Sequence, residues 1–161
     1  MMSQMIIAST TGELEKVAEL IRDQWLSIDD RATSSANELV LPMAIEDEPR
    51  QTTGLWANRT ILQSRRATLR IGNLVEHEVE DPECIGATPV SEISLDGDTV
   101  TIQGCAPVAL RAKVSGLLVT LEVTDEIVDK TVSCRIFGFD IFDQSPSFHT
   151  RKGVFKWQRR P

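Results

Sequence analysis

The sequence has few of the residues that bind metals or act as nucleophiles. It holds two histidines, His77 and His149, and three cysteines, Cys84, Cys105 and Cys134, with no His-x-x-x-His or Cys-x-x-Cys spacing. A zinc site would need ligands gathered from distant parts of the chain. Because the number of cysteines is odd, a complete disulfide framework is excluded, and we expect reduced, partly buried thiols of a cytoplasmic protein. We therefore expect neither a metal nor a cofactor.

Motifs for phosphate binding and covalent catalysis are also missing. The chain has no Walker loop, no Gly-x-Gly-x-x-Gly and no Gly-x-Ser-x-Gly, which are local signatures of nucleotide binding and of serine nucleophiles. No apolar run approaches the roughly 20 residues that span a bilayer, and the N-terminus lacks the basic segment of a signal peptide. These absences favour a cytoplasmic protein without a membrane span.

Basic residues are outnumbered by acids, and the charge is unevenly spread along the chain. The 161 residues include 24 acids against 17 lysines and arginines, which gives a net charge of −7. Five of the basic residues lie in the tail from Arg151 to Pro161, so the remainder carries 12 against 24 acids. An acidic body repels phosphate backbones, so we expect a basic protein partner and no nucleic acid over the main surface. The length suits a single domain over residues 1–161.

One segment has the period of an amphipathic helix. Its apolar residues recur at i, i+3, i+4, i+7 and i+11, and they are Leu14, Val17, Ala18, Ile21 and Trp25. Thr10 and Glu13 precede most of this stripe with the spacing of a capping box. We predict a helix over about residues 12–26, followed by a polar linker over residues 27–37.

From residue 38 to about 158 the apolar period changes to two, which predicts a β-rich body. The first strand, over residues 39–45, contains Pro42, and we place it at a sheet edge because proline cannot donate to a ladder. Residues 46–60 are predicted as the longest loop. Residues 66–80 are predicted as a strand that Gly72-Asn73 breaks in two.

The clearest hairpin signal lies at residues 92–102. Its two-residue loop is either Asp96-Gly97 in a type I′ turn or Gly97-Asp98 in a type II′ turn. Residues 108–123 fit two alternatives, a second hairpin around Ser115-Gly116 or one long strand with a bulge at the same glycine.

Two more strands are predicted, at residues 131–142, which are apolar on both faces and hence central, and at residues 154–158. One helix followed by many short strands is typical of an antiparallel fold. We predict a mainly β protein, an antiparallel β-sandwich or flattened barrel of about seven to nine strands. Its single N-terminal amphipathic α-helix would cover an open end or face of the sheets.

Three carboxylates are the main candidates for a binding site. Glu76, Glu78 and Glu80 share one face of a predicted strand, and Trp56 lies in the predicted long loop, where binding residues gather. We hypothesise that they bind a basic partner, such as a toxin or nuclease, in the manner of an immunity protein. The alternative is a solvated strand face whose charges prevent edge pairing, with Trp56 folded back over the core.

Two other functions stay open at this point. A small hydrolase or isomerase would use His77 or His149 with a carboxylate as general base, in a pocket between sheets. His77 shares the apolar face of its strand, which favours a half-buried packing residue instead. A structural subunit of a larger assembly would use edge strands and the tail from Arg151 to Pro161, which either adds a strand or binds an anionic surface. The oligomeric state is left open.

Overall fold

Two antiparallel sheets and one helix make up the part of the chain that the structure describes, residues 3–28, 34–35, 37–54, 57–105, 107–136 and 139–143. The large sheet contains β1 (Gln4–Ala8), β2 (Trp25–Ser27), β3 (Ser34–Ser35), β4 (Glu38–Glu46), β5 (Arg50–Thr53), β6 (Ala57–Ile71), β8 (Ala87–Pro89), β12 (Val119–Ile136) and β13 (Phe139–Asp143). The small sheet contains β7 (Leu74–Glu80), β9 (Glu92–Asp96), β10 (Thr99–Gln103) and β11 (Ala109–Val114). The helix is α1 (Thr11–Ile21).

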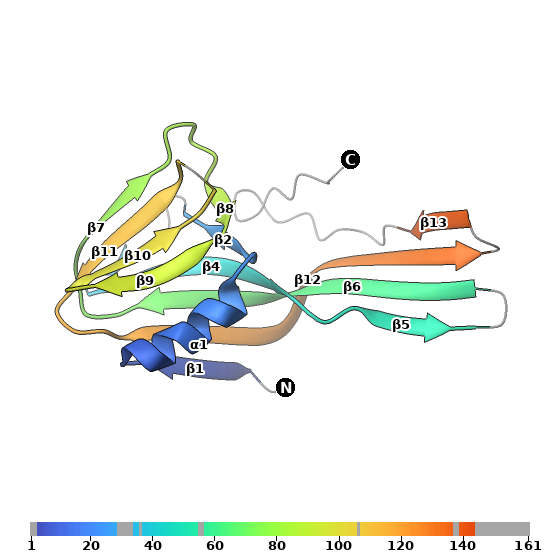
Figure 1. Cartoon of the computed structure of the whole chain (residues 1–161), viewed down its shortest axis with the longest axis horizontal. Coiled ribbons are helices and arrows are strands. Elements are labelled where there is room, and N and C mark those ends of the chain that lie inside the picture. Colours follow the sequence, from blue (N-terminus) through green and yellow to red (C-terminus); the bar gives the residue numbers. More distant parts are fainter. Residues whose placement is uncertain are drawn as a thin grey trace.

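The two sheets face each other in this computed structural model (Figure 1). The large sheet has the order β1-β12-β6-β4-β2-β8, with β13, β3 and β5 paired to β12, β4 and β6, and the small sheet has the order β7-β11-β10-β9. Over the described residues the sheets do not close into a barrel. The predicted mainly β sandwich with one helix is confirmed. Its strands are more numerous than expected, because several are only two to five residues long.

The core lies between the inner faces of the two sheets. One row across the large sheet joins Leu41, Leu69 and Leu121 in direct cross-strand register, and all three are fully buried. Facing them from the small sheet are further buried residues, among them Val100 and Ile102. Each fully buried aliphatic side chain of this size contributes roughly 1.5–3 kcal/mol, so these rows hold the sandwich together.

The helix begins where the sequence predicts and ends earlier. Thr10 Oγ1 accepts from the Glu13 backbone N–H at 3.3 Å, and Glu13 Oε2 accepts from the Thr10 N–H at 3.2 Å. After Ile21 the chain turns through Asp23, whose φ is 62°. Trp25 then opens β2. The predicted end near residue 26 is therefore wrong, since Trp25 matches the helical spacing but belongs to a strand.

The helix closes one open side of the sandwich, as predicted. Its buried residues are Leu14, Val17 and Ile21. The helix packs against β1 and β9, which lie at the same side of the large and small sheets (Figure 1). The apolar stripe thus fills the gap that the two strands leave between the layers.

The strand that contains Pro42 is internal, so its predicted edge position is wrong. β4 lies between β6 and β2 in the sheet order. On the side away from β6, the described pairs involve Glu38 and Leu39 with β3, and Met43 and Ala44 with β2. No described strand pairs with Pro42 on that side, and a residue without an N–H is tolerated at such a gap.

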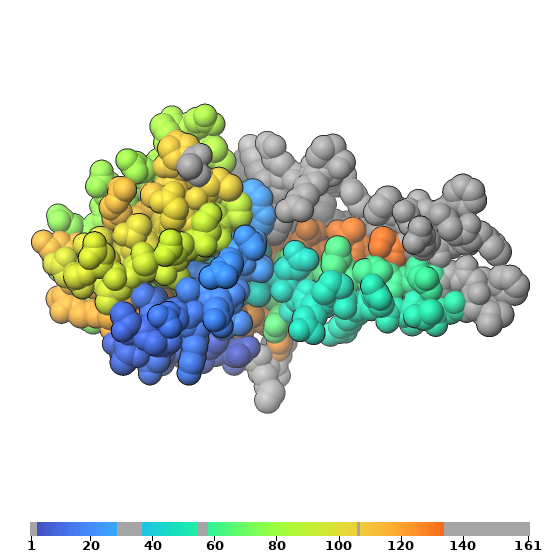
Figure 2. All heavy atoms as spheres, viewed as in Figure 1, coloured from blue at the N-terminus to red at the C-terminus, as the bar shows by residue number. Residues whose placement is uncertain are grey.

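A long arm replaces the loop predicted at residues 46–60. These residues contain β5 and the start of β6, which form a hairpin. β6 and β12 run on past the sandwich, and β5 and β13 flank them to form a four-stranded arm. Figure 2 shows the arm extending beyond the body. The prediction of a loop failed because the polar segment Arg50–Thr53 forms a strand by pairing with β6.

At the end of the body opposite the arm, the chain passes twice between the two sheets, and the two connecting segments lie side by side. The Gly72 N–H donates to the Leu118 carbonyl at 2.8 Å, and the Ser115 N–H donates to the Asn73 carbonyl at 2.8 Å. Asn73 has a φ of 53°, and its side chain donates to the Gly116 carbonyl at 3.2 Å. The predicted break at Gly72-Asn73 is confirmed. Both alternatives for residues 108–123 are wrong, because β11 and β12 belong to different sheets.

The hairpin at residues 92–102 is confirmed and its register is resolved. Asp96 pairs with Thr99, so the loop residues are Gly97 and Asp98. Gly97 has a φ of 62°, and Asp98 is not among the residues with positive φ. This combination is the type II′ alternative.

The last predicted strands are tested only in part. Residues 131–136 are the end of β12, which lies inside the sheet between β6 and β13, whereas β13 lies at its margin. The predicted strand at 154–158, the basic tail from Arg151, His149 and Trp56 fall outside the described residues.

Candidate protein-binding face

The three predicted carboxylates lie together on the outer face of β7, an edge strand of the small sheet. Glu76, Glu78 and Glu80 are all exposed. Their cross-strand neighbours on β11 are Lys113, Arg111 and Ala109, respectively. The structure therefore places basic side chains directly beside two of the three glutamates, which the sequence analysis did not anticipate.

The basic neighbours neutralise this strand only in part. Arg111 Nη1 lies 3.2 Å from Glu80 Oε2, with the two side chains 45% and 54% exposed. Ion pairs this exposed contribute little to stability and are screened by salt. Neither Glu76 nor Glu78 has an ion pair among the described residues.

The face continues across all four strands of the small sheet. The outward residues of β10 are neutral, and the outward residues of β9 include Glu92 and Asp96. We call the whole surface the acidic sheet face, defined by Glu76, Glu78, Glu80, Lys113, Arg111, Thr99, Thr101, Gln103, Glu92, Ser94 and Asp96. It carries five carboxylates against two cations. An exposed, charged sheet face suits contact with a macromolecule better than the binding of a small molecule.

His77 is exposed, so the expectation of a half-buried packing residue is wrong. It lies opposite the buried Ala112 on the inner side of the sheet. Because β7 is an edge strand, no further strand of the small sheet covers its side chain. Two open hollows of the described surface, one beside Asn73 and one beside Asp47, are not lined by His77.

Two of the cysteines are free and exposed, namely Cys84 and Cys105. The prediction of unpaired thiols is confirmed for these two, but the prediction of partial burial is wrong. Cys84 lies in the connection between β7 and β8 with a φ of 51°. There the Asp81 carboxylate accepts from the backbone N–H groups of Ile85 at 3.0 Å and Gly86 at 2.8 Å. The side chain of Cys134 lies outside the described set.

No cluster of three or more metal-binding side chains occurs within the described residues. The one helix found there is also too short to cross a membrane. Comparison with known protein families, with curated proteins and with solved structures gives no match.

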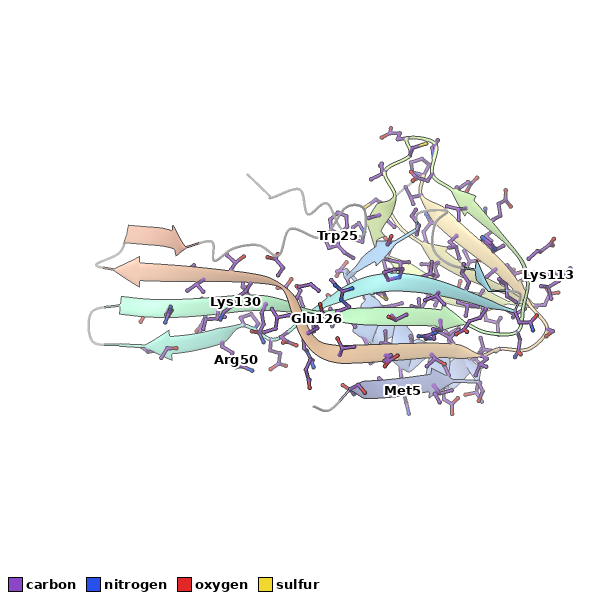
Figure 3. The ribbon with its side chains drawn as sticks, turned by 180° about the vertical axis from the view of Figure 1, so that it is seen from behind. Met5, Trp25, Arg50, Lys113, Glu126 and Lys130 are labelled. Carbon is purple, nitrogen blue, oxygen red and sulfur yellow. The ribbon has the colours of Figure 1, made fainter. Side chains whose placement is uncertain are left out.

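Sequence reasoning missed a basic face on the arm. Arg50, Arg59 and Lys130 share one face, because β5, β6 and β12 are in the register Arg50↔Ile61, Thr52↔Arg59 and Gln63↔Lys130. None of the three cations has an ion pair among the described residues. Arg50 and Lys130 are both labelled on the arm in Figure 3. The available signal was composition, since residues 50–66 contain four arginines and no acid.

Proposed function

We propose that this chain is a non-catalytic protein-binding domain whose acidic sheet face binds a basic protein. The observation that carries the proposal is the exposed row Glu76, Glu78 and Glu80 at a free sheet edge. Over the whole acidic sheet face, five carboxylates outnumber two cations. Such a field steers a basic partner into contact and raises the association rate.

The finer form of the proposal is neutralisation of a toxin or nuclease. A nuclease binds phosphates through lysines and arginines. Carboxylates in a row along a strand would form ion pairs with those lysines and arginines in place of the phosphates. The spacing of alternate residues on a strand is about 6.6–6.8 Å, which is comparable to the separation of phosphates along one nucleic acid strand.

The test begins by identifying the partner through affinity capture from the source cells, followed by mass spectrometry. Binding of the purified partner is then measured with the variant Glu76→Gln/Glu78→Gln/Glu80→Gln, which removes the three charges without placing lysines beside Arg111. We expect the association rate to fall about tenfold at low salt, with a smaller effect at high salt.

The matched control is Glu15→Gln/Glu19→Gln/Glu48→Gln, which removes the same charge from exposed residues of α1 and of the β4–β5 connection. Association slowed equally by the control would mean that net charge, and not the acidic sheet face, governs binding. An unchanged rate in the β7 variant would refute the proposed face directly.

A further inference from the structure

The edge strand β1 lacks the features by which sheet edges normally avoid pairing with other molecules. Its sequence, Gln-Met-Ile-Ile-Ala, has no charge and no proline. It pairs with β12 and with no other described strand. In Figures 1 and 3 it forms the rim of the large sheet. A neutral, apolar edge of this kind presents unpaired backbone groups to any strand that can reach it.

The other sheet margins of at least three described residues are protected. β7 carries three glutamates, β9 carries Glu92 and Asp96, and β5 carries Arg50. β13 contains two aspartates, and β8 is only three residues long and ends in Pro89. Among the described sheet margins of three or more residues, β1 is thus the one without a charge or a proline.

Two apolar side chains project from β1 on the outer face of the sheet. Met5 is 58% exposed and Ile7 is 54% exposed. Their cross-strand neighbours on β12 are Glu122 and Thr120, whereas Ile6 and Ala8 lie opposite the buried Leu121 and Val119. Figure 3 labels Met5 at this margin. These two side chains add an apolar surface to the open backbone edge.

The strand is complementary to itself. If a second β1 is aligned antiparallel with Ile6 opposite Ile6, Met5 lies opposite Ile7 of the second copy, and Gln4 lies opposite Ala8. The outer face then holds two adjacent Met–Ile pairs. Cross-strand apolar pairs of this type stabilise a ladder. In a two-fold dimer, both copies contribute the same surface to the interface.

Charge opposes the approach of a second copy least at this edge. Two chains of net charge −7 repel each other over most of their surfaces, and they can approach most closely where the strand itself is uncharged. The nearest cross-strand carboxylate, Glu122, lies 4.0 Å from Arg70, which offsets part of its charge. We propose that two copies of this chain pair through β1 in antiparallel register centred on Ile6, so that their large sheets join into one continuous sheet.

The first experiment is sedimentation velocity of the full chain from low micromolar to millimolar concentration. A five-residue contact is small beside a standard interface, so we expect a weak, concentration-dependent dimer. Raising the salt concentration should leave it intact or strengthen it, because the contact is apolar and the copies repel. Met5→Lys and Ile7→Lys should abolish dimerisation. The control Val75→Lys, at an exposed valine on β7, should leave it unchanged.

The second experiment tests the register. In a background of Cys84→Ser, Cys105→Ser and Cys134→Ser, the variants Met5→Cys and Ile7→Cys are prepared separately and then mixed under mild oxidation. Opposite residues in an antiparallel pair have Cα atoms about 4.5–5.5 Å apart, within the disulfide range. The mixture should yield a cross-linked dimer, while each variant alone should not.

A chain that stays monomeric at millimolar concentration would overturn the proposal, as would equal cross-linking in the separate and mixed samples. Neither result would bear on the proposed function, because the proposed binding face lies on the small sheet and β1 belongs to the large sheet. Conversely, loss of partner binding in the β7 variant would leave the β1 dimer unaffected.

Discussion

Arg65 and Asp47 form an ion pair at the base of the arm, with 2.7 Å between Arg65 Nε and Asp47 Oδ1. The same carboxylate accepts from Gln63 Nε2 at 2.9 Å, and the Asp47 backbone N–H donates to the Gln63 carbonyl at 2.8 Å. Asp47 follows the last residue of β4, so these contacts attach the β4–β5 connection to β6. They set the path by which the chain leaves the body and enters the arm.

Asp47→Ala should therefore destabilise the protein by about 1–2 kcal/mol, because hydrogen bonds to a partly buried charge contribute more than exposed pairs do. The side chains of Arg65 and Asp47 are 30% and 18% exposed. Urea unfolding measures the change. The neighbouring Glu48→Ala, at an exposed residue, is the control and should lie close to wild type. Equal unfolding midpoints for both variants would contradict a structural role for the ion pair.

Gly104→Ala should destabilise the fold by about 1–3 kcal/mol through overpacking. A Cβ at this position would overlap the side chain of Thr88. Thr88 cannot easily move away, because it is buried and its Oγ1 accepts from the Cys105 N–H at 2.9 Å. Gly12→Ala is the control, since no atom lies within 4 Å of its added Cβ and alanine is the better helix former. In thermal unfolding, the midpoint should fall below that of wild type for Gly104→Ala and rise slightly above it for Gly12→Ala.

Gly97→Ala should cost roughly 1–2 kcal/mol, because the left-handed backbone at this turn is unfavourable for residues with a Cβ. Its φ is 62° and the space around it is open, so strain and not collision is the cause. At Gly116, where an added Cβ would meet Asn73 Nδ2 at an ordinary 3.6 Å, alanine should have a smaller effect. Chemical denaturation of both variants gives the comparison. A smaller loss at Gly97 than at Gly116 would argue against the type II′ turn.

The start of the helix should weaken in acid. The Ser9 backbone N–H, donating at 2.7 Å, is the largest of several hydrogen bonds from Ser9 and Thr10 that lower the pKa of Glu13 below its ordinary 4.5. A lowered folded-state pKa means that the stabilisation is complete above the unfolded value and is lost as the pH falls through the folded value. Glu13→Gln should therefore flatten the dependence of stability on pH below about 5. The measurement is the free energy of unfolding, obtained by chemical denaturation of wild type and variant at each pH. If this free energy falls equally steeply in acid for both proteins, protonation of Glu13 does not weaken the start of the helix.

Local signals in the sequence predicted those structural features that depend on contacts between residues close together in the chain. The Thr10–Glu13 capping box and the hairpin at residues 92–102 are set by contacts a few residues apart, and both were found. The end of the helix was not, because Trp25 continues the apolar spacing of Ile21. What removes it from the helix is pairing with Ala44 and Pro89, which are distant in sequence and invisible to a periodicity argument.

The same division applies to the candidate site. Alternation predicted that Glu76, Glu78 and Glu80 share one face, and the structure agrees. The positions of Lys113 and Arg111 beside them depend on the register between β7 and β11, which no local pattern encodes. His77 was misjudged for a related reason, since an inward-facing residue is buried only when another element covers the edge of its sheet.

The long pairing of β6 with β12 has a consequence for the order in which the protein folds. It is the most extensive ladder among the described strands, and it joins residues 57–71 to residues 119–136. The whole small sheet lies between them in sequence. Contacts of such separation raise the contact order and slow folding, because the loop must close before the ladder can form. On the ribosome, β6 emerges long before its partner, and in a nascent chain ending before residue 119 the edge of β6 that pairs with β12 has no partner strand. The body and the arm can therefore be completed only after β12 has been synthesised, since this strand belongs to both.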